Sequence, residues 1–496
     1  MTLLREPSEQ GRLRPTLGLF TATTLIVGSM IGSGIFRLPA NMMARVQDPF
    51  WLLMVWVVGG IFTICGALTF AELAGIFPKA GGQYAFLRET LGKKWAFLFG
   101  WTFFWVVQTG IIAAVAVVFA EFTQRLFGFG GSWVPAVAVS CVVFLSVVNF
   151  LGARFGGLVQ NIFTVAKVGA LLLLIILGFL AGKPDHSTFG QDVATAPPGG
   201  LLFSAFFAAM LSGLFALDGW PQAAYVAPEI KNPKTNVPKA MILGVSTVTV
   251  VYVLATAAYL YLVEANDFIA IGRGELRGPI AAAAAAAFSG ELGARLISAA
   301  VMISTFGTVN AFILTSPRIF YAVAEDGMFP QRMRNIDANT NVPTFAIAVQ
   351  GTWAGLLICL SRFSNDAYLA LVNATVFCIW LFYIPTTIGY FKLRRTRPDL
   401  PRPYRTTFYP IVPFLFLLAG FLVVGNSFYE NVRDLIREPW TGALFANLTS
   451  IWGTIAVLLG LPFVLYWRNK EKRGEESPTI YVPAADQPQG ASSPHA

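Results

Sequence analysis

The sequence predicts an all-α, polytopic membrane protein with twelve transmembrane helices. Of its 496 residues, 55% are hydrophobic and only 12% are charged, a balance far more apolar than that of soluble globular proteins. A membrane-spanning helix needs about 20 predominantly apolar residues. Segments of that kind lie near 17–44, 49–77, 95–126, 134–152, 157–181, 200–226, 238–263, 293–325, 342–361, 366–391, 407–429 and 445–467.

The positive charges predict how the chain is oriented. The net charge is +9, and Lys and Arg are concentrated in the connections on the side that carries both termini. Because cytoplasmic loops carry the excess of Lys and Arg in membrane proteins, both termini are expected in the cytoplasm and the protein in the inner (plasma) membrane. The basic excess then reflects topology, so the lipid bilayer is an expected partner and nucleic acid is not.

Residues 17–467 are expected to form a single transmembrane domain. The N-terminal segment 1–16 and the C-terminal segment 468–496 are polar and are predicted to be cytoplasmic tails, the second disordered. After the second span, 85–94 is amphipathic and predicts an interfacial helix. The connection 264–291 contains seven consecutive alanines and predicts a short helix that caps the external mouth.

The sequence lacks the usual residues of a nucleotide, metal or catalytic site. It has no G-x-x-x-x-G-K-[ST] phosphate loop, only two His, and four Cys that all fall inside predicted spans. No cofactor, metal or enzymatic activity is therefore expected. If the protein transports a solute, it must draw on a gradient or on exchange.

Two of the predicted helices cannot run straight through the membrane. The first contains glycines from Gly28 to Gly34, and the sixth contains Asp218, Gly219 and Pro221. Glycine weakens a helix and proline removes a backbone donor, while unpaired backbone at this depth is tolerated only around a cavity. If helices 1–5 and 6–10 are inverted repeats, with 11 and 12 peripheral, both breaks fall in the first helix of a repeat. Paired breaks of this kind indicate a transporter's substrate site.

The backbone groups exposed at such breaks can bind the carboxylate and the ammonium group of an amino acid. A helix that starts at Gly32–Gly34 offers amides and the positive end of its dipole to a carboxylate. Carbonyl groups left free before each break can accept hydrogen bonds from an ammonium group. The alternative is that the glycines serve close helix packing.

Four local motifs resemble the amino acid–polyamine–organocation (APC) superfamily, and within it the L-type amino acid transporter branch. They are Ile31-Gly32-Ser33-Gly34-Ile35-Phe36; Glu72-Leu73 with Pro78 to Gly82 and Tyr84; Asp218-Gly219-Trp220 with Pro228 to Pro233; and Ser316-Pro317-Arg318 with Tyr321, Ala322, Asp326, Gly327 and Pro330. The resemblance implies a leucine-transporter-like five-plus-five inverted repeat with broken helices 1 and 6, and alternating access to a central site.

The resemblance also implies a set of substrate-binding residues. The amides of Gly32, Ser33 and Gly34 would hold the carboxylate, and the carbonyls of Ile31, Phe215 and Asp218 the amino group, with Ala216 and Gly219 completing the second break. Phe215 occupies the place of an aromatic gate, although such a residue is ordinarily core or lipid contact. Asp218 has two interpretations: it binds a cationic side chain, or it caps the second half of helix 6, which is the plainer role.

Lys167 is an intramembrane charge within an apolar run, and its ammonium needs acceptors at that depth. Sodium-independent members of the superfamily place a helix-5 lysine where others bind sodium. By resemblance, Lys167 would contact the Gly28 carbonyl and either Ser304 or Thr305. A fixed cation argues against sodium coupling and leaves exchange or proton coupling open.

Two further charges are candidates for an inner gate. Glu72 and Arg318 lie near cytoplasmic helix ends, where solvated charges are equally common. Arg37, just past the first break, is a candidate for the outer vestibule.

The sequence departs from the resemblance in one respect that concerns partners. Animal L-type members link to a heavy subunit through a cysteine between helices 3 and 4, and here 126–133 contain none. We therefore expect a stand-alone, sodium-independent secondary transporter of neutral L-amino acids that works by exchange. The alternatives are a proton-coupled symporter, a cationic amino acid or polyamine carrier, and a sensor that binds amino acids without transporting them.

Overall fold

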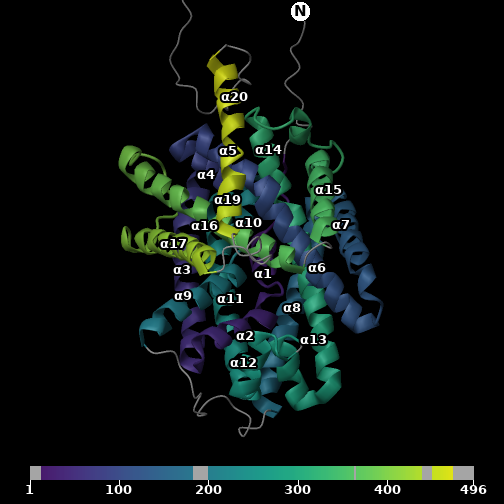
Figure 1. Cartoon of the computed structure of the whole chain (residues 1–496). Helices are drawn as coiled ribbons and strands as arrows, with labels where there is room; N and C mark the ends of the chain where they lie inside the picture. Colours follow the sequence, from purple (N-terminus) through teal and green to yellow (C-terminus); the bar gives the residue numbers. More distant parts are fainter. Residues whose placement is uncertain (1–12, 182–198, 277, 362–364, 438–448, 473–496) are drawn as a thin grey trace, which may run out of the picture.

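The computed structural model describes residues 13–181, 199–276, 278–361, 365–437 and 449–472. Within these ranges the regular structure is helical, apart from an isolated bridge between Leu17 and Ile230 (Figure 1). In the described part of the chain, nine helices are long and apolar enough to cross a membrane, or ten if the bent pair α1 (Leu19–Met30) and α2 (Gly34–Val46) forms one span. The prediction of an all-α, multi-pass membrane protein is confirmed. Most of the two expected tails, 1–12 and 473–496, lies outside the described residues.

Every predicted span has an apolar helix at its position, although the sixth and ninth, Leu202–Ala216 and Thr344–Leu360, are shorter than the others. The count of twelve spans and the inverted repeat stay predictions. The other helices are α3 (Pro49–Ile76), α4 (Gln83–Leu91), α5 (Lys93–Thr102), the π-helix η1 (Phe103–Val107), α6 (Gln108–Phe127), α7 (Val134–Phe150), α8 (Ala153–Ala181), α9 (Gly199–Ala216), α10 (Gln222–Tyr225), the 3-10 turn η4 (Ala227–Glu229), α11 (Pro233–Leu262), α12 (Ala265–Arg273), α13 (Ile280–Thr315), α14 (Pro317–Glu325), α15 (Thr344–Ser361), α16 (Asn365–Thr396), α17 (Ile411–Arg437), α19 (Thr449–Leu458) and α20 (Leu461–Lys472).

One connection and the last helix differ from the sequence prediction, and a second connection agrees with it in part. The segment expected as an interfacial helix is α4, whose side chains are mostly buried because it packs against α5 and α16. The seven alanines lie in a helix that starts at Ile280 and ends at a kink at Gly290, where φ is 60° and ψ is -145°, and the rest of α13 continues to Thr315. The short helix expected there is therefore present, and its place over the external mouth stays a prediction. The last helix, α20, continues to Lys472, past the expected end at 467.

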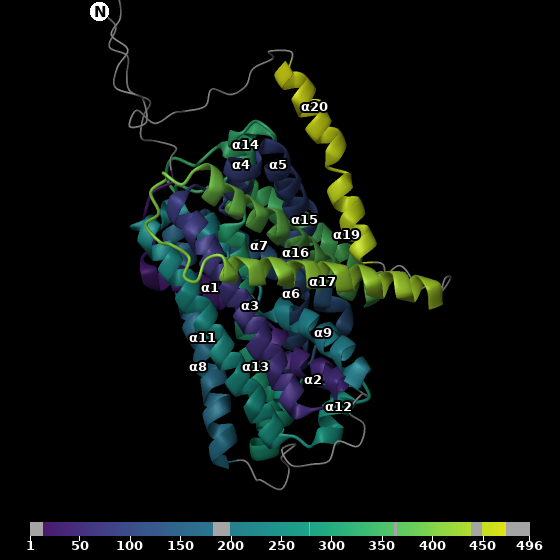
Figure 2. The same cartoon turned by 90° about the vertical axis from the view of Figure 1, so that its left-hand side faces the viewer.

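The helices form a bundle with two distinct ends. Helices α4 and α14 lie at the end where α1 begins, which we call the α4 end, and α2 and α12 lie at the opposite end, the α12 end (Figure 1). Figure 2 shows α17 crossing the outside of the bundle and α20 standing apart from it. The expectation that the eleventh and twelfth spans are peripheral additions to the repeats stays a prediction.

Both predicted breaks are present in the middle of the bundle. Residues 31–33 separate α1 from α2, and the two helices are bent by 41°. The second break, 217–221, separates α9 from α10 and contains Gly219 with a φ of 101°. Such a positive φ is strained for any residue with a side chain, which explains glycine at that position.

Candidate functional site

The two breaks touch and form one structural unit. Ser29 Oγ, in the last turn of α1, lies 2.8 Å from the Gly219 carbonyl oxygen and can donate to it. Tyr252 of α11 donates its hydroxyl to the Met30 carbonyl at 2.8 Å and lies 3.3 Å from that of Ala216. A Cβ at Gly219 would lie 3.0 Å from the carbonyl carbon of Ser29, so the contact needs glycine on both conformational and steric grounds.

The glycines of the first break differ in how much space a Cβ atom would have. A Cβ on Gly34 would approach Ala216 Cβ to 2.9 Å, so Gly34 permits close packing of α2 on α9. A Cβ on Gly32 would meet Thr308 at an ordinary 3.7 Å. The packing alternative therefore holds for Gly34 and does not explain Gly32.

The start of α2 presents unpaired amides. The Gly32 N–H donates to the Met30 carbonyl at 3.0 Å, whereas those of Ser33 and Gly34 have no hydrogen-bond partner within the described part of the chain. Both amides belong to the first turn of a helix, where the helix dipole favours an anion. Two of the three amides expected to hold a carboxylate are thus available for that role.

The Lys167 ammonium group is buried in α8 among four oxygen atoms. Its Nζ lies 2.8 Å from the Gly28 carbonyl, 2.7 Å from that of Ile31 and 2.7 Å from that of Ser304, and 2.9 Å from Thr308 Oγ1. The Lys167 side chain therefore joins α8, the first break and α13.

One predicted partner of Lys167 is wrong. The hydroxyl of Thr305 lies 2.8 Å from the Val301 carbonyl within its own helix, and Thr308 takes the place expected for Thr305. Residues four apart share a helix face, so Thr308 lies on the same face as Ser304 and Thr305 does not. Ser304 contributes its carbonyl to Lys167, while its hydroxyl lies 2.9 Å from the Ile31 carbonyl.

The Ile31 carbonyl does not have the place expected for it. It was expected to face a substrate ammonium, but it lies 2.7 Å from Lys167 Nζ and 2.9 Å from Ser304 Oγ. A carbonyl oxygen has two lone pairs, and these donors can occupy both. The predicted substrate contact at Ile31 is therefore replaced here by a contact with the protein's own lysine.

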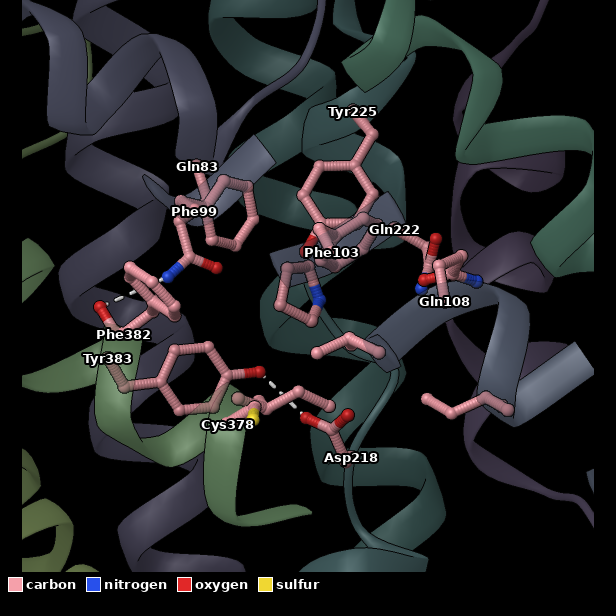
Figure 3. A pocket seen from close by; sticks show the side chains of 14 residues that line it. Gln83, Phe99, Phe103, Gln108, Asp218, Gln222, Tyr225, Cys378, Phe382 and Tyr383 are labelled. Carbon is pink, nitrogen blue, oxygen red and sulfur yellow. Dashed lines mark hydrogen bonds between the residues drawn. The ribbon is translucent and has the colours of Figure 1, made fainter. Parts of the chain in front are cut away.

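A small pocket opens beside the second break, and it contains Asp218 but none of residues 31–34 (Figure 3). Asp218 is partly buried, and its Oδ1 accepts a hydrogen bond from the Tyr383 hydroxyl of α16 at 2.7 Å. Helix α10 begins after Pro221 without a side-chain cap. The capping role favoured for Asp218 is therefore wrong: its carboxylate faces a pocket.

Besides the second break, the pocket walls come mainly from the third and tenth predicted spans. Phe103 and Val107 belong to the π-helix η1, Gln108 begins α6, and Cys378 and Tyr383 belong to α16. π-helical turns inside α-helices frequently occur at functional sites. Which faces of these helices turn inward depends on tertiary packing, so the sequence carries no signal for them beyond their aromatic and amide side chains.

Phe215, the predicted gate, lies in the last turn of α9, next to the second break. Its side chain is partly buried and packs against the hydrophobic core. Its carbonyl accepts from the Asp218 amide at 3.2 Å.

The predicted inner-gate charges form buried ion pairs near the α4 end. Arg318 of α14 makes a bidentate pair with Glu229, with Nε–Oε1 at 2.6 Å and side chains 0% and 1% exposed. Glu72 of α3 is also fully buried and binds Arg394 at 2.6 Å and Arg402 at 3.2 Å. The alternative of solvated helix-end charges is wrong for both residues. Sequence reasoning missed all three partners, because they come from distant segments.

The α12 end carries a weaker charge pair. Arg37 of α2 lies 3.6 Å from Glu121 of α6, and their side chains are 41% and 38% exposed. Exposed pairs of this kind contribute little to stability. Among the described residues, no group of three His, Cys, Asp or Glu side chains could hold a metal ion.

Comparisons with known proteins agree with this geometry. A family model described as amino acid permease matches residues 17–462. The serine/threonine exchanger SteT of Bacillus subtilis is 32% identical over 86% of this chain and 94% of its own length. The mouse b(0,+)-type amino acid transporter 1 is 30% identical over 93% of this chain and 91% of its own. The mouse large neutral amino acids transporter small subunit 2 is 32% identical over 93% of this chain and 83% of its own.

The broken helices, the buried lysine and the match over nearly the whole membrane region lead to one assignment. The chain belongs to the amino acid permease family of the APC superfamily, in its L-type-like branch.

Proposed function

We propose that this protein is a sodium-independent exchanger of neutral L-amino acids that works by alternating access around the two breaks. The observation that carries the proposal is the buried Lys167 ammonium, bound to carbonyls of the first break and of α13. A permanent cation at this place satisfies the carbonyls that a sodium ion would otherwise coordinate. Substrate transport is then not coupled to a sodium ion. The transporter returns to its starting conformation by carrying a second amino acid in the opposite direction.

The substrate carboxylate is held at the start of α2. The Ser33 and Gly34 amides lack partners among the described residues, and the α2 dipole favours an anion there. The substrate's amino group is assigned to the carbonyls of the second break, Phe215 and Asp218, because Ile31 is occupied by Lys167. Phe215 closes over the bound molecule from the side of the α12 end.

Alternating access requires the two ends of the bundle to open in turn. We assign the α4 end to the cytoplasm, together with both termini, and the α12 end to the outside. The Arg318–Glu229 pair joins α14 to the segment after α10 and acts as the closed inner gate, with the Glu72 cluster supporting it. The vestibule past Arg37 is the outer path.

Residues 17–467 act as one transport unit in the inner (plasma) membrane, without catalysis and without a nucleic acid partner. We propose that it works without a disulfide-linked heavy subunit. Cys65, Cys141 and Cys378 are buried, and the exposed Cys359 lies within α15 rather than in the connection between α6 and α7.

Uptake of radiolabelled threonine into proteoliposomes tests the proposal, in sodium-free buffer at two pH values. We expect uptake only when the vesicles contain unlabelled amino acid, with no change on adding sodium. Uptake into empty vesicles that requires an inward proton gradient would instead make the protein a proton symporter. Threonine binding without counterflow would make it a sensor, and preferential uptake of arginine that Asp218→Asn abolishes would make it a cationic amino acid carrier.

A further inference from the structure

The pocket beside Asp218 contains a buried amide donor that the proposed function has not used. Gln108 begins α6, directly after the π-helix η1, and its side chain is 1% exposed. Its Nε2 has no hydrogen-bond partner among the described residues. An unpaired buried amide donor is costly, and in the lining of a pocket a bound molecule can satisfy it.

The other two amide side chains of the pocket, Gln83 and Gln222, already have protein partners. Gln83 donates to the Phe382 carbonyl at 3.2 Å and to Thr386 Oγ1 at 3.1 Å. Gln222 accepts a hydrogen bond from Thr315. Of the described residues that line the pocket, Gln108 is the one with a buried polar side-chain atom that lacks a partner.

A second polar group of opposite character faces the same space. Figure 3 shows Asp218 below Gln108 among the side chains that line the pocket, and Asp218 is only partly buried. It can accept a hydrogen bond, whereas Gln108 Nε2 can only donate one. The remaining walls include Phe103, Val107 and Ile111, which are apolar and offer no competing partner.

We propose that Gln108 determines side-chain specificity and selects amino acids whose side chain carries a hydrogen-bond acceptor, a hydroxyl or a carboxamide. The inference rests on the proposed function and adds the substrate class. A hydroxyl or a carboxamide oxygen accepts a hydrogen bond from Gln108 Nε2. An aliphatic side chain leaves the Gln108 donor unpaired, and so does an ammonium or guanidinium group, which can pair only with Asp218.

Threonine and valine are nearly the same shape, so their competition isolates the hydroxyl. For each we would measure kcat/KM of exchange in proteoliposomes, for the wild type and for Gln108→Met, which keeps the unbranched side chain but not the donor. The threonine-to-valine ratio should fall about tenfold, because a site built to bond a hydroxyl loses its preference with the bond. Most of the loss should appear as a higher KM for threonine, with valine little changed.

Gln350→Met is the matched control. Gln350 in α15 is 0% exposed, and its Nε2 and Oε1 are also buried without partners among the described residues, but it does not line the pocket. The control should leave the ratio unchanged. An unchanged ratio in Gln108→Met, the same shift in the control, or an equal loss for both amino acids would each overturn the inference. If the wild type transports neither amino acid, the proposed function itself fails, which is a separate result.

Discussion

Replacing Lys167 with methionine tests the role of the buried cation. Methionine keeps most of the stem volume, so the main change is the loss of an ammonium bound by four oxygen atoms. The hydroxyls of Ser304 and Thr308 lie 2.9–3.1 Å from the carbonyls of Gly28 and Ile31 and can pair with both. The Ser304 carbonyl lies inside α13 and keeps the amide of Thr308 as its partner. The loss is therefore the part of the charged hydrogen bonds that these hydroxyls do not replace, about 1.5–3 kcal/mol for one such bond.

The magnitude of the effect follows from that cost. A loss of about 2 kcal/mol shifts the equilibrium between the intact and the loosened first break by about 30-fold. We expect kcat/KM for exchange to fall by about that factor in Lys167→Met, while the purified protein remains folded. The assay is initial-rate exchange in proteoliposomes, with the melting temperature measured in the same detergent.

Lys239→Met is the control, because it removes an exposed lysine of α11 and leaves the Lys167 site intact. It should exchange at the wild-type rate. Wild-type exchange in Lys167→Met would refute the argument, because the ammonium would then contribute nothing to the geometry of the break. If Lys167→Met does not fold, the same assay is made on Lys167→Arg, which retains the charge and should keep part of the activity.

Three further predictions follow from the packing and from the ion pairs. Arg318→Met alone should lower unfolding stability by about 3–5 kcal/mol, since it leaves the Glu229 carboxylate buried and unpaired, and the double variant with Glu229→Met should recover most of the loss in a thermal-shift assay. Glu72→Gln should speed tryptic cleavage within 397–410 by releasing its arginine partners, whereas Asp399→Asn, which removes an exposed pair at 3.9 Å, should not. Gly32→Ala should leave the melting temperature unchanged but weaken threonine binding in calorimetry, because its Cβ has room beside Thr308 at 3.7 Å yet crowds the expected carboxylate site.

Each of these has a contradicting result. If the single and double variants were equally stable, Arg318 and Glu229 would not be energetically coupled. Unchanged proteolysis of Glu72→Gln would mean that its carboxylate does not hold the 397–410 connection. Normal threonine binding by Gly32→Ala would place the carboxylate elsewhere.

The elements predicted well from sequence are those set by the chain's own local chemistry. Clustered glycines weaken an apolar helix, proline removes a backbone donor and aspartate is costly there, so the sequence predicts both breaks. Lys167 lies in an apolar run and needs acceptors near its own depth. The contact with the Gly28 carbonyl was predicted through family resemblance and is present at 2.8 Å.

The features missed are those that depend on which helix faces meet. Thr308 replaced Thr305 because only residues four apart share the face turned to Lys167. The partner of Arg318 lies 89 positions away, and nothing in the local sequence selects it. The pocket residue Gln108 directly follows a π-helical turn, and the hydrophobic periodicity of the sequence does not predict that turn.

A structure of the protein with bound threonine would test the central claim most directly. Our account predicts the carboxylate within hydrogen-bond distance of the Ser33 and Gly34 amides, with Lys167 still bound to the Gly28 and Ile31 carbonyls and no sodium ion between α1, α8 and α13. Threonine bound away from both breaks, or a sodium ion among those carbonyls, would contradict it.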